Sequence, residues 1–289
     1  MFIPFICLYY HFPTPILSIV FMFLVVLLVV IPPKPSNLVV ATLLSPILDH
    51  FQYDEIVENN PVHIKESMKG EGKRYIFASQ PHGLVPFCGI AHQIKHARLH
   101  MDEPLIKTAV ASRVLLTPLL KQVMGLLNCV PASRKSLTTT LEDESIRLYV
   151  GGTSEVFYNT SEKEFLHLTK HKGFIKLALQ TGIDIVPVYE FGNSSIFQVY
   201  KHSMLIKLSK FLQLPVTYFW GSSKLLPFIP KPRKLLHITG QPLGMPHIPR
   251  PRPNHIDEWH KKYVFEVSRI FEAYKERHPD YKHKQLVII

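Results

Sequence analysis

Short apolar runs alternate with amphipathic stretches over most of the 289-residue chain, and this alternation limits the fold more than any other feature. Runs rich in β-branched and aromatic residues predict strands at 75–78, 107–111, 146–150, 183–189, 216–220 and 235–239. Apolar positions at helical spacing predict helices at 90–99, 118–127, 137–144, 173–180 and 256–277. Because helices between strands act as crossover connections, we expect an α/β fold with a mostly parallel central sheet flanked by helices.

One stretch departs from the alternation. Residues 225–253 are rich in proline and basic side chains, which favours an excursion over the surface and not a second domain. We therefore expect a single folded domain over residues 37–289.

The N-terminus is apolar and carries no lysine, arginine, aspartate or glutamate before Lys34. As a helix, residues 16–31 would be about 24 Å long, slightly shorter than a hydrocarbon core. Pro13 and Pro15 separate them from a second apolar stretch, so a kinked span and a re-entrant hairpin are both compatible with the sequence. A secretory signal peptide would need a basic segment first. We expect residues 1–36 to be an uncleaved membrane anchor, with the domain behind Lys34 facing the cytosol.

Composition narrows the partners of the chain. A formal net charge of +11 and an isoelectric point near 9.5 predict attraction to an anionic leaflet, a nucleic acid or a phosphate-bearing substrate. The basic residues form no nucleic-acid-binding motif, so nucleic acid is the weakest of the three. The three cysteines, Cys7, Cys88 and Cys129, are widely spaced and contain no CxxC pair, which argues against a disulfide framework and a zinc knuckle.

The tetrapeptide Gln80-Pro81-His82-Gly83 follows the predicted strand 75–78 and carries the strongest chemical signal. An imidazole on a turn between proline and glycine is held in place, and its pKa lies near neutrality. Such a group suits general-base removal of a proton from an alcohol. We expect His82 to be the catalytic base, with Pro81 and Gly83 shaping the turn against substrate. An isolated histidine in a turn would more often be structural, so this expectation depends on the motifs around it.

Three more motifs lie at predicted strand ends or helix starts, where open α/β sheets place their ligands. Gly151-Gly152-Thr153-Ser154-Glu155 would let the backbone approach substrate and present a carboxylate. Glu155 would be catalytic or orient the acceptor, or else cap the next helix or pair with a lysine. Ser133-Arg134-Lys135 precedes a predicted helix and could bind phosphate or be a solvated helix start. Lys172-Gly173 opens another helix, where Lys172 is expected to be structural and Gly173 to permit close packing, with substrate contact as the alternative.

His92, His96 and His100 recur at every fourth position, which would stack three imidazoles on one helix face. A zinc or diiron site is one interpretation, and a diiron oxygenase is then the competing enzyme class. The chain offers only one ExxH pair, Glu164 with His167, whereas diiron bundles use two. We therefore predict a solvated polar face and no metal site.

Together, QPHG, VPASRKS, GGTSE, KGFIKLALQTGIDIVPVYEFG, LPFIPKPRKLLHITGQPL and the tail HIDEWHKKYVFEVSRIFEAYKERH resemble the type-2 diacylglycerol acyltransferase family, which includes monoacylglycerol and wax-ester acyltransferases. The motifs occur in the same order along nearly the whole chain. The resemblance implies a glycerolipid acyltransferase-like fold and acyl transfer from acyl-CoA to a neutral lipid hydroxyl, at the cytosolic side of the endoplasmic reticulum membrane and near lipid droplets. It implies acyl-CoA as co-substrate and no other cofactor.

The resemblance also implies roles for single residues. His82 matches the base of the HxxxxD motif of related glycerolipid acyltransferases, while Phe87 stands where that motif has aspartate. Glu155 matches the glutamate of the family's GGxxE motif, where it would replace the missing carboxylate or contact the acceptor. Gln80 replaces a histidine that many members have, and Glu190 and Asn193 also depart from the common pattern.

The expected product is triacylglycerol made from diacylglycerol, with monoacylglycerol and fatty alcohol as alternative acceptors. A membrane-bound acyl-CoA or lipid binder that has lost activity is the non-enzymatic alternative, favoured by Gln80 and opposed by His82 and Glu155. Hydrolase chemistry is disfavoured because the chain has no GxSxG nucleophile elbow. A homo-oligomer is compatible with the sequence.

Overall fold

A central sheet organises the computed structural model, which describes residues 18–23, 26, 31, 33–58, 68, 72–117, 119–212 and 216–289. Seven strands follow one another across this sheet in the spatial order β1-β10-β7-β2-β5-β3-β4. The strands are β1 (Tyr53–Val57), β10 (Leu235–Thr239), β7 (Asp184–Phe191), β2 (Tyr75–Gln80), β5 (Ile146–Tyr149), β3 (Lys107–Val110) and β4 (Cys129–Pro131). From β7 to β4 every pairing is parallel, whereas β10 runs antiparallel to β7 and carries β1 with it. The prediction of a mostly parallel sheet is confirmed.

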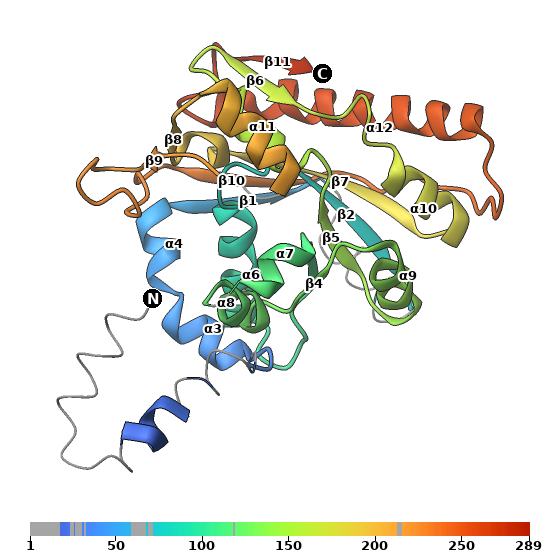
Figure 1. Cartoon of the computed structure of the whole chain (residues 1–289). Coiled ribbons are helices and arrows are strands. Elements are labelled where there is room, and N and C mark those ends of the chain that lie inside the picture. Colours follow the sequence, from blue (N-terminus) through green and yellow to red (C-terminus); the bar gives the residue numbers. More distant parts are fainter. Residues whose placement is uncertain are drawn as a thin grey trace.

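Helices cover both faces of the sheet (Figure 1). One face carries α3 (Asn37–Leu43), α4 (Pro46–Phe51), α6 (Phe87–Leu99), α7 (Ser112–Leu116) and α8 (Leu120–Leu126). The other carries α9 (Arg134–Asp143), α10 (Gly173–Thr181) and α12 (Pro253–Tyr274), whose apolar side chains join the main core. The remaining elements are α11 (Ser203–Leu212), β6 (Lys163–Leu166), β8 (Gln198–Val199), β9 (Phe219–Trp220), β11 (Gln285–Ile288) and the 3₁₀ turns η1 (Gly152–Phe157), η2 (Asn193–Ser195) and η3 (Lys275–Arg277).

Strand β2 lies in the middle of the sheet, and every one of its residues is buried. Because side chains alternate across a strand, Ile76 and Ala78 enter the main core beside α10 and α12, while Tyr75 and Phe77 join a separate apolar cluster. A parallel strand covered on both faces is expected to be apolar throughout. The strand ends at Gln80, so the histidine turn emerges from the centre of the sheet.

Most predicted elements are confirmed, with shifted ends. Predicted strand 216–220 is reduced to β9, which pairs with β8 outside the main sheet. The stretch 225–253 contains the buried strand β10 between two irregular segments, so it is a surface excursion only on either side of that strand. Strands β1, β4, β6, β8 and β11 and helices α3, α4, α7 and α11 were not predicted.

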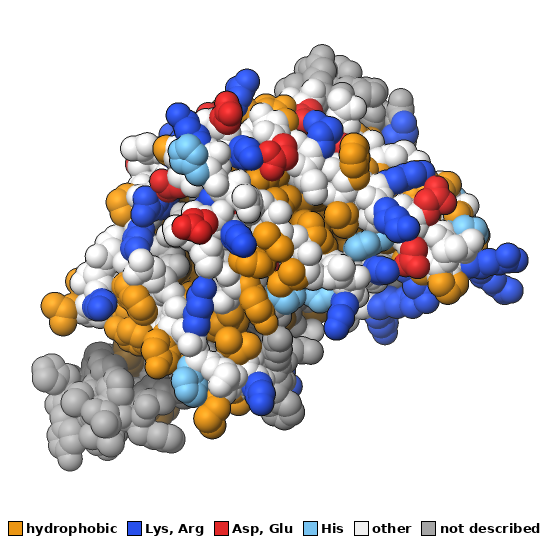
Figure 2. Space-filling model, turned by 90° about the horizontal axis from the view of Figure 1, so that it is seen from above, with side chains coloured by type: hydrophobic (Ala, Val, Ile, Leu, Met, Phe, Trp, Pro, Cys, Tyr) orange, Lys and Arg blue, Asp and Glu red, His pale blue; other side chains and the backbone are white. Residues whose placement is uncertain are grey.

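The predicted anchor, residues 1–36, falls largely outside the described residues. Within the part of the chain that the structure describes, no helix has the length and apolar character needed to span a bilayer. Seen from above, the surface shows hydrophobic side chains interspersed with many lysines and arginines (Figure 2).

Candidate active site

The turn after β2 is fixed by a side chain that lies more than a hundred residues away in the sequence. Asn193, almost fully buried in η2, donates from Nδ2 to the carbonyl oxygens of Pro81 at 3.0 Å and His82 at 2.8 Å. Its Oδ1 accepts the backbone N–H of Cys88, in the first turn of α6, at 3.3 Å. Gly83 has a φ of +61°, and a Cβ there would press on the Asn193 carbonyl at 2.7 Å, so this position requires glycine.

Glu155 holds the same turn from the other side. Its buried carboxyl group accepts the backbone N–H of His82 at 2.9 Å and that of His167 at 3.3 Å. A Cβ at Gly151 would collide with this carboxyl group, which explains the first glycine of the GGTSE motif. Burial raises the pKa of Glu155 to about 8, although the two N–H donors act in the opposite direction. Glu155 thus contacts the backbone of His82 and not its ring.

The half-buried His82 ring is oriented by its own turn. Its Nδ1 lies 2.7 Å from the Gly83 carbonyl oxygen, which can only accept, so the proton resides on Nδ1 and Nε2 keeps its lone pair. Burial lowers the pKa of His82, and the hydrogen bond to Gly83 opposes this shift. The Tyr149 ring meets the imidazole edge-on at a centroid distance of 5.1 Å. The side chain is therefore a neutral base near pH 7 with its basic nitrogen directed away from the turn.

A buried polar cluster lies between the sheet and α6, next to this histidine. Tyr149 donates its hydroxyl to the Glu190 carboxyl oxygens at 2.9 and 3.1 Å. Burial raises the pKa of Glu190 to about 7, and nearby Arg147 acts to lower it. Arg147 itself is buried and donates to the Gly89 carbonyl at 3.0 Å and to His92 Nδ1 at 2.9 Å. The cluster connects β5, β7 and α6 next to the histidine turn.

This cluster corrects the prediction for the histidine series on α6. His92 faces the sheet, where it stacks on His237 at 4.4 Å and accepts from Arg147, so it is not part of a solvated face. Burial and the nearby Arg147 charge hold its pKa well below the usual range. His96 and His100 turn toward Glu103 instead, at 4.0 and 3.6 Å. Among the described residues, no group of three metal-ligating side chains converges.

Gln80, the first residue of the QPHG motif, is fully buried. Its Oε1 accepts the hydroxyl proton of Tyr263 from α12, and its Nε2 has no hydrogen-bond partner among the residues that the structure describes. The Gln80–Pro81 peptide bond is cis. Gln80 therefore ties the end of β2 to α12 and lies on the opposite face of the sheet from Arg147.

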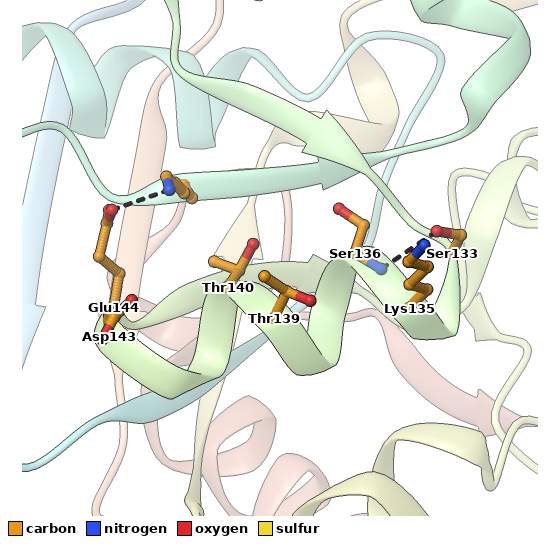
Figure 3. Close-up of a pocket in the computed structure, with 8 residues that line it drawn as sticks. Ser133, Lys135, Ser136, Thr139, Thr140, Asp143 and Glu144 are labelled. Carbon is orange, nitrogen blue, oxygen red and sulfur yellow. Dashed lines mark hydrogen bonds and ion pairs between the residues drawn. The ribbon is translucent and has the colours of Figure 1, made fainter.

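The predicted phosphate-binding motif, Ser133-Arg134-Lys135, follows β4, the strand at one end of the sheet order. Ser133 caps α9 by accepting the N–H of Ser136 at 3.3 Å, and Arg134 donates to Gln180 at 2.8 Å. Lys135 lines an open hollow of about 410 Å³ along α9 (Figure 3), where a second lysine, Lys107, is paired with Glu144. Three strand spacings, about 14 Å, separate β4 from β2. These residues share the carboxyl edge of the sheet with His82 but do not touch it.

Lys172 and Gly173 lie closer to the histidine turn. They line a hollow of about 340 Å³ that also includes Tyr149, Lys170 and His171. Lys172 makes an ion pair with Asp257 of α12 at 2.7 Å, in agreement with a structural role. A Cβ at Gly173 would meet nothing within 4 Å, so the expectation that this glycine permits close packing is wrong.

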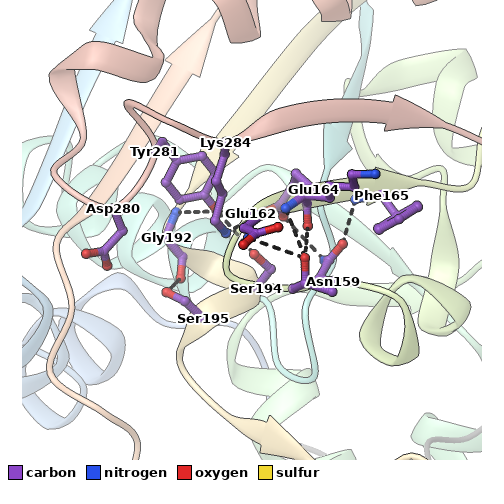
Figure 4. A network of polar contacts seen from close by, with 12 residues as sticks. Asn159, Glu162, Glu164, Phe165, Gly192, Ser194, Ser195, Asp280, Tyr281 and Lys284 are labelled. Carbon is purple, nitrogen blue, oxygen red and sulfur yellow. Dashed lines mark hydrogen bonds and ion pairs between the residues drawn. The ribbon is translucent and has the colours of Figure 1, made fainter.

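The C-terminal segment contacts the residues on either side of Asn193 and the strand β6 (Figure 4). Tyr281 accepts the N–H of Gly192 at 3.2 Å and contacts the Ser194 hydroxyl at 3.1 Å, on both sides of Asn193. Three residues later, Lys284 makes a buried ion pair with Glu164 at 2.9 Å, where β11 joins β6. The residue that fixes the histidine turn is thus itself held by the end of the chain.

Comparison with known proteins identifies the group to which this site belongs. The diacylglycerol acyltransferase family profile matches residues 9–289. The chain belongs to this family. Similar curated proteins are diacylglycerol O-acyltransferase 2 from Danio rerio, 26% identical over 71% of the chain, and human 2-acylglycerol O-acyltransferase 3, 26% identical over 71%. A third is diacylglycerol O-acyltransferase 2 from Dictyostelium discoideum, 27% identical over 70%.

The matched part spans a little under two thirds of these relatives, 62%, 65% and 66% of their own lengths. No solved structure matches the chain. Within the family, the resemblance noted from the QPHG, GGTSE and C-terminal motifs is confirmed.

Sequence reasoning missed the supporting residues of the site. Arg147 interrupts an otherwise apolar predicted strand, and Glu190 directly follows the predicted strand 183–189. A charge in or next to a buried strand is a recognisable signal of a buried polar network. In the sequence, Asn193, like Glu190, stands out only as a departure from the common family pattern. Its clamp on the histidine turn joins residues far apart in the sequence, and no local pattern predicts it.

Proposed function

We propose that this chain is an acyl-CoA-dependent O-acyltransferase that transfers a fatty acyl group to the hydroxyl of a neutral lipid. Diacylglycerol is the preferred acceptor in this proposal, and triacylglycerol the product. Family membership and the names of the similar proteins support the reaction class. The human relative named as a 2-acylglycerol O-acyltransferase supports monoacylglycerol as the alternative acceptor, with a fatty alcohol as a further one.

The observation that carries the proposal is the state of His82. Its Nδ1 is held by the Gly83 carbonyl, and among the described residues no protein group bonds Nε2. Nε2 would take the proton of the acceptor hydroxyl while that oxygen forms a bond to the thioester carbonyl carbon. When the tetrahedral intermediate collapses, the carbon–sulfur bond breaks and the imidazolium returns the proton to the leaving thiolate of coenzyme A. No covalent acyl-enzyme is needed.

The structure also restricts the roles of two groups near the His82 ring, the backbone N–H of His82 and the Cys88 thiol. The backbone N–H of His82 already donates to the Glu155 carboxyl group, so it is not free to bind the oxyanion. Other backbone amides of the glycine-containing turns would have to stabilise it. Glu155 acts in this proposal as a positioning residue for His82. Cys88 is not a plausible nucleophile, because burial, with nearby Glu190, raises the pKa of its thiol well above the usual range.

Acyl-CoA would lie along the carboxyl edge of the sheet. The hollow at Lys170, Lys172 and Gly173 adjoins Tyr149, which touches the His82 ring, and could take a phosphate group of coenzyme A. The amino end of α9, with Ser133 and Lys135, offers a second cationic position farther along the same edge. A co-substrate as long as acyl-CoA would reach both positions.

The location is also part of the proposal. Residues 1–36 would anchor the chain in the endoplasmic reticulum membrane as a kinked span or re-entrant hairpin, and residues 37–289 would form the domain on its cytosolic side. The charge-free N-terminus and the first basic residue at Lys34 support this arrangement. Lipid droplets and self-association are further expectations from the family resemblance.

The test uses membranes that contain the full chain, labelled acyl-CoA, and diacylglycerol, monoacylglycerol or fatty alcohol as acceptor. Labelled triacylglycerol should form, and His82→Ala should lower the rate about 10²- to 10⁴-fold with an unchanged melting temperature. Exclusive formation of diacylglycerol or wax ester would reassign the acceptor. No product from any acceptor, with labelled acyl-CoA still bound, would identify an inactive binder and overturn the proposal.

A further inference from the structure

The segment after the catalytic turn has an unusual charge distribution. Between Glu190 and Asp257 the sequence contains no aspartate or glutamate. Within that stretch lie several cationic side chains, namely Lys201, Lys207, Lys224, Lys231, Arg233 and Lys234. A shorter stretch of the same kind lies between Glu103 and Glu142, with five lysines and arginines and no acidic residue. A region of this length with cations alone is suited to a polyanionic partner.

Residues 198–212 and 216–231 form one excursion from the domain. Strands β8 and β9 pair antiparallel, and α11 lies between them in sequence. The loop after β9 folds back on itself through backbone hydrogen bonds. The N–H of Gly221 donates to the carbonyl of Pro227 at 3.1 Å, and the N–H of Lys231 donates to the carbonyl of Ile196 at 3.2 Å. In Figure 1 this loop and α11 lie on the same side of the molecule, and Figure 2 shows hydrophobic and cationic side chains together on that side.

The excursion exposes large apolar side chains. In the loop, Leu225 is 91% and Phe228 77% exposed, and Leu226 lies between them. On α11, Met204 is 71% exposed, and Leu208 lies one turn farther on the same side. A helix at the surface of a soluble domain turns such positions inward. Tyr200 and Tyr218 are also exposed, so aromatic hydroxyls border the apolar group, as they do at bilayer interfaces.

We propose that this surface, the docking face, rests on an anionic lipid leaflet. It comprises Tyr200, Met204, Leu208, Tyr218, Leu225 and Phe228. The apolar tips would enter the boundary between headgroups and acyl chains, and Lys207, Lys224 and Lys231 would face the lipid phosphates. Charge complementarity selects an anionic leaflet over a second copy of this basic chain, which would meet like charge. The docking face is separate from the proposed N-terminal anchor.

Docking at this face would bring the candidate active site to the membrane. Helix α11 packs against η1, the turn that carries Glu155, and Lys201 donates to the Asn159 carbonyl at 2.9 Å just beyond η1. The proposal goes beyond acyl transfer, since it assigns a membrane contact and its lipid charge preference without using the reaction.

The two tryptophans of the chain allow a direct test. Trp220 lies in β9 at the docking face, with Lys224 over its ring at 5.6 Å, whereas Trp259 lies on α12. The full chain with Trp259→Phe retains only Trp220, and Trp220→Phe retains only Trp259. Each variant is reconstituted in vesicles of brominated phosphatidylcholine with or without brominated phosphatidylglycerol. Bromine quenches only a tryptophan at membrane depth, so Trp220 should be quenched in anionic vesicles and Trp259 should not.

Substitutions in the docking face then test which side chains contact the membrane. In the Trp259→Phe background, Leu225→Glu with Phe228→Glu should abolish quenching of Trp220. The matched control is Phe265→Glu, an exposed phenylalanine on α12, which should leave it unchanged. Lys224→Glu with Lys231→Glu should remove the preference for anionic lipid.

Equal quenching of both tryptophans, or none of Trp220, would overturn the proposal. Concentration-dependent shielding of Trp220 in detergent without vesicles would assign this face to self-association instead. Acyl transfer is measured separately on the same preparations. A chain that fails to dock but transfers acyl groups refutes only the docking face, and one that docks without transfer refutes only the proposed reaction.

Discussion

Asn193 is the single side chain on which the geometry of the histidine turn depends most. Replacing it with alanine leaves two carbonyl oxygens and the Cys88 N–H without their bonds in a buried position. We expect Asn193→Ala to lower the free energy of unfolding by about 2–3 kcal/mol. We also expect kcat to fall about 10²-fold, because a displacement of about 1 Å at the base has that effect. Thermal melts and acyl-transfer kinetics on the same preparations measure both.

Asn37 provides a matched control. Its Nδ2 also donates to backbone carbonyls distant in sequence, those of His100, Met101 and Glu103, but remote from the histidine turn. Asn37→Ala should cost similar stability and leave kcat unchanged. If both variants lose stability and activity in the same proportion, Asn193 has only a structural role.

Glu155 should make stability depend on pH. Its pKa of about 8 in the folded protein exceeds the ordinary value, so the folded state binds the proton more tightly than the unfolded chain does. The stabilising contribution is complete in acid and is lost as the pH rises from about 4.5 through 8. Glu190, with a pKa of about 7, contributes in the same direction.

We therefore expect the melting temperature to fall between about pH 5 and 8, and to fall less steeply in Glu155→Gln, which has no proton to lose. The comparison is of slopes, because the amide also replaces one acceptor and lowers stability at every pH. An identical slope in the variant would show that Glu155 is ionised throughout.

At the scale of elements, the contact between α6 and the sheet should tolerate no side chain at Gly89. A Cβ there would collide with the Tyr149 hydroxyl and lie 3.2 Å from Glu190 Oε1. We expect Gly89→Ala to break the Tyr149–Glu190 hydrogen bond, to lower stability by about 1–3 kcal/mol and to reduce activity. The control is Gly173→Ala, at an open helix start, where the change should be neutral or slightly stabilising. Equal effects of the two substitutions would contradict the close packing seen at α6.

The elements also show how far sequence reasoning extends. Strand β2 is a continuous apolar run, and helices α10 and α12 have apolar residues at helical spacing. The sequence therefore predicts the ends of all three to within a few residues. Strand β4 has three residues and β1 contains Asp54 and Glu55, so neither carries a local signal, and pairing with β3 and β10 determines them. The prediction that His92 lies on a solvated helix face is wrong for a related reason. A histidine among lysines is read as solvated, yet Arg147, a partner far along the chain, draws it against the sheet.

At the scale of the whole molecule, the histidine turn is held by residues from three distant parts of the chain. The backbone of His82 is bonded to Glu155 after β5 and to Asn193 after β7, while Gln80 bonds to Tyr263 on α12. The sequence motifs predict His82 and the glycines at one edge of the sheet. The clamps depend on the order of strands in the sheet, which brings β5 and β7 to either side of β2.

The C-terminus is the most remote of these supports, and Lys284 tests it. This lysine and Glu164 are both buried, so Lys284→Met would leave an unpaired carboxylate in the interior. We expect a loss of about 3–5 kcal/mol in the free energy of unfolding, and recovery of most of it when Glu164→Leu is added, since an apolar pair can replace a buried ion pair. Lys172→Met, which breaks the exposed pair with Asp257, should cost less than about 1 kcal/mol.

Activity distinguishes a general loss of stability from a loss of support. Release of β11 would free Tyr281, whose hydroxyl accepts the Gly192 N–H next to Asn193. The Lys284→Met enzyme should therefore lose kcat well below its melting temperature, and the double variant should regain it. If kcat remains normal in the single variant while its melting temperature falls, the C-terminal strand stabilises the domain without positioning the histidine turn.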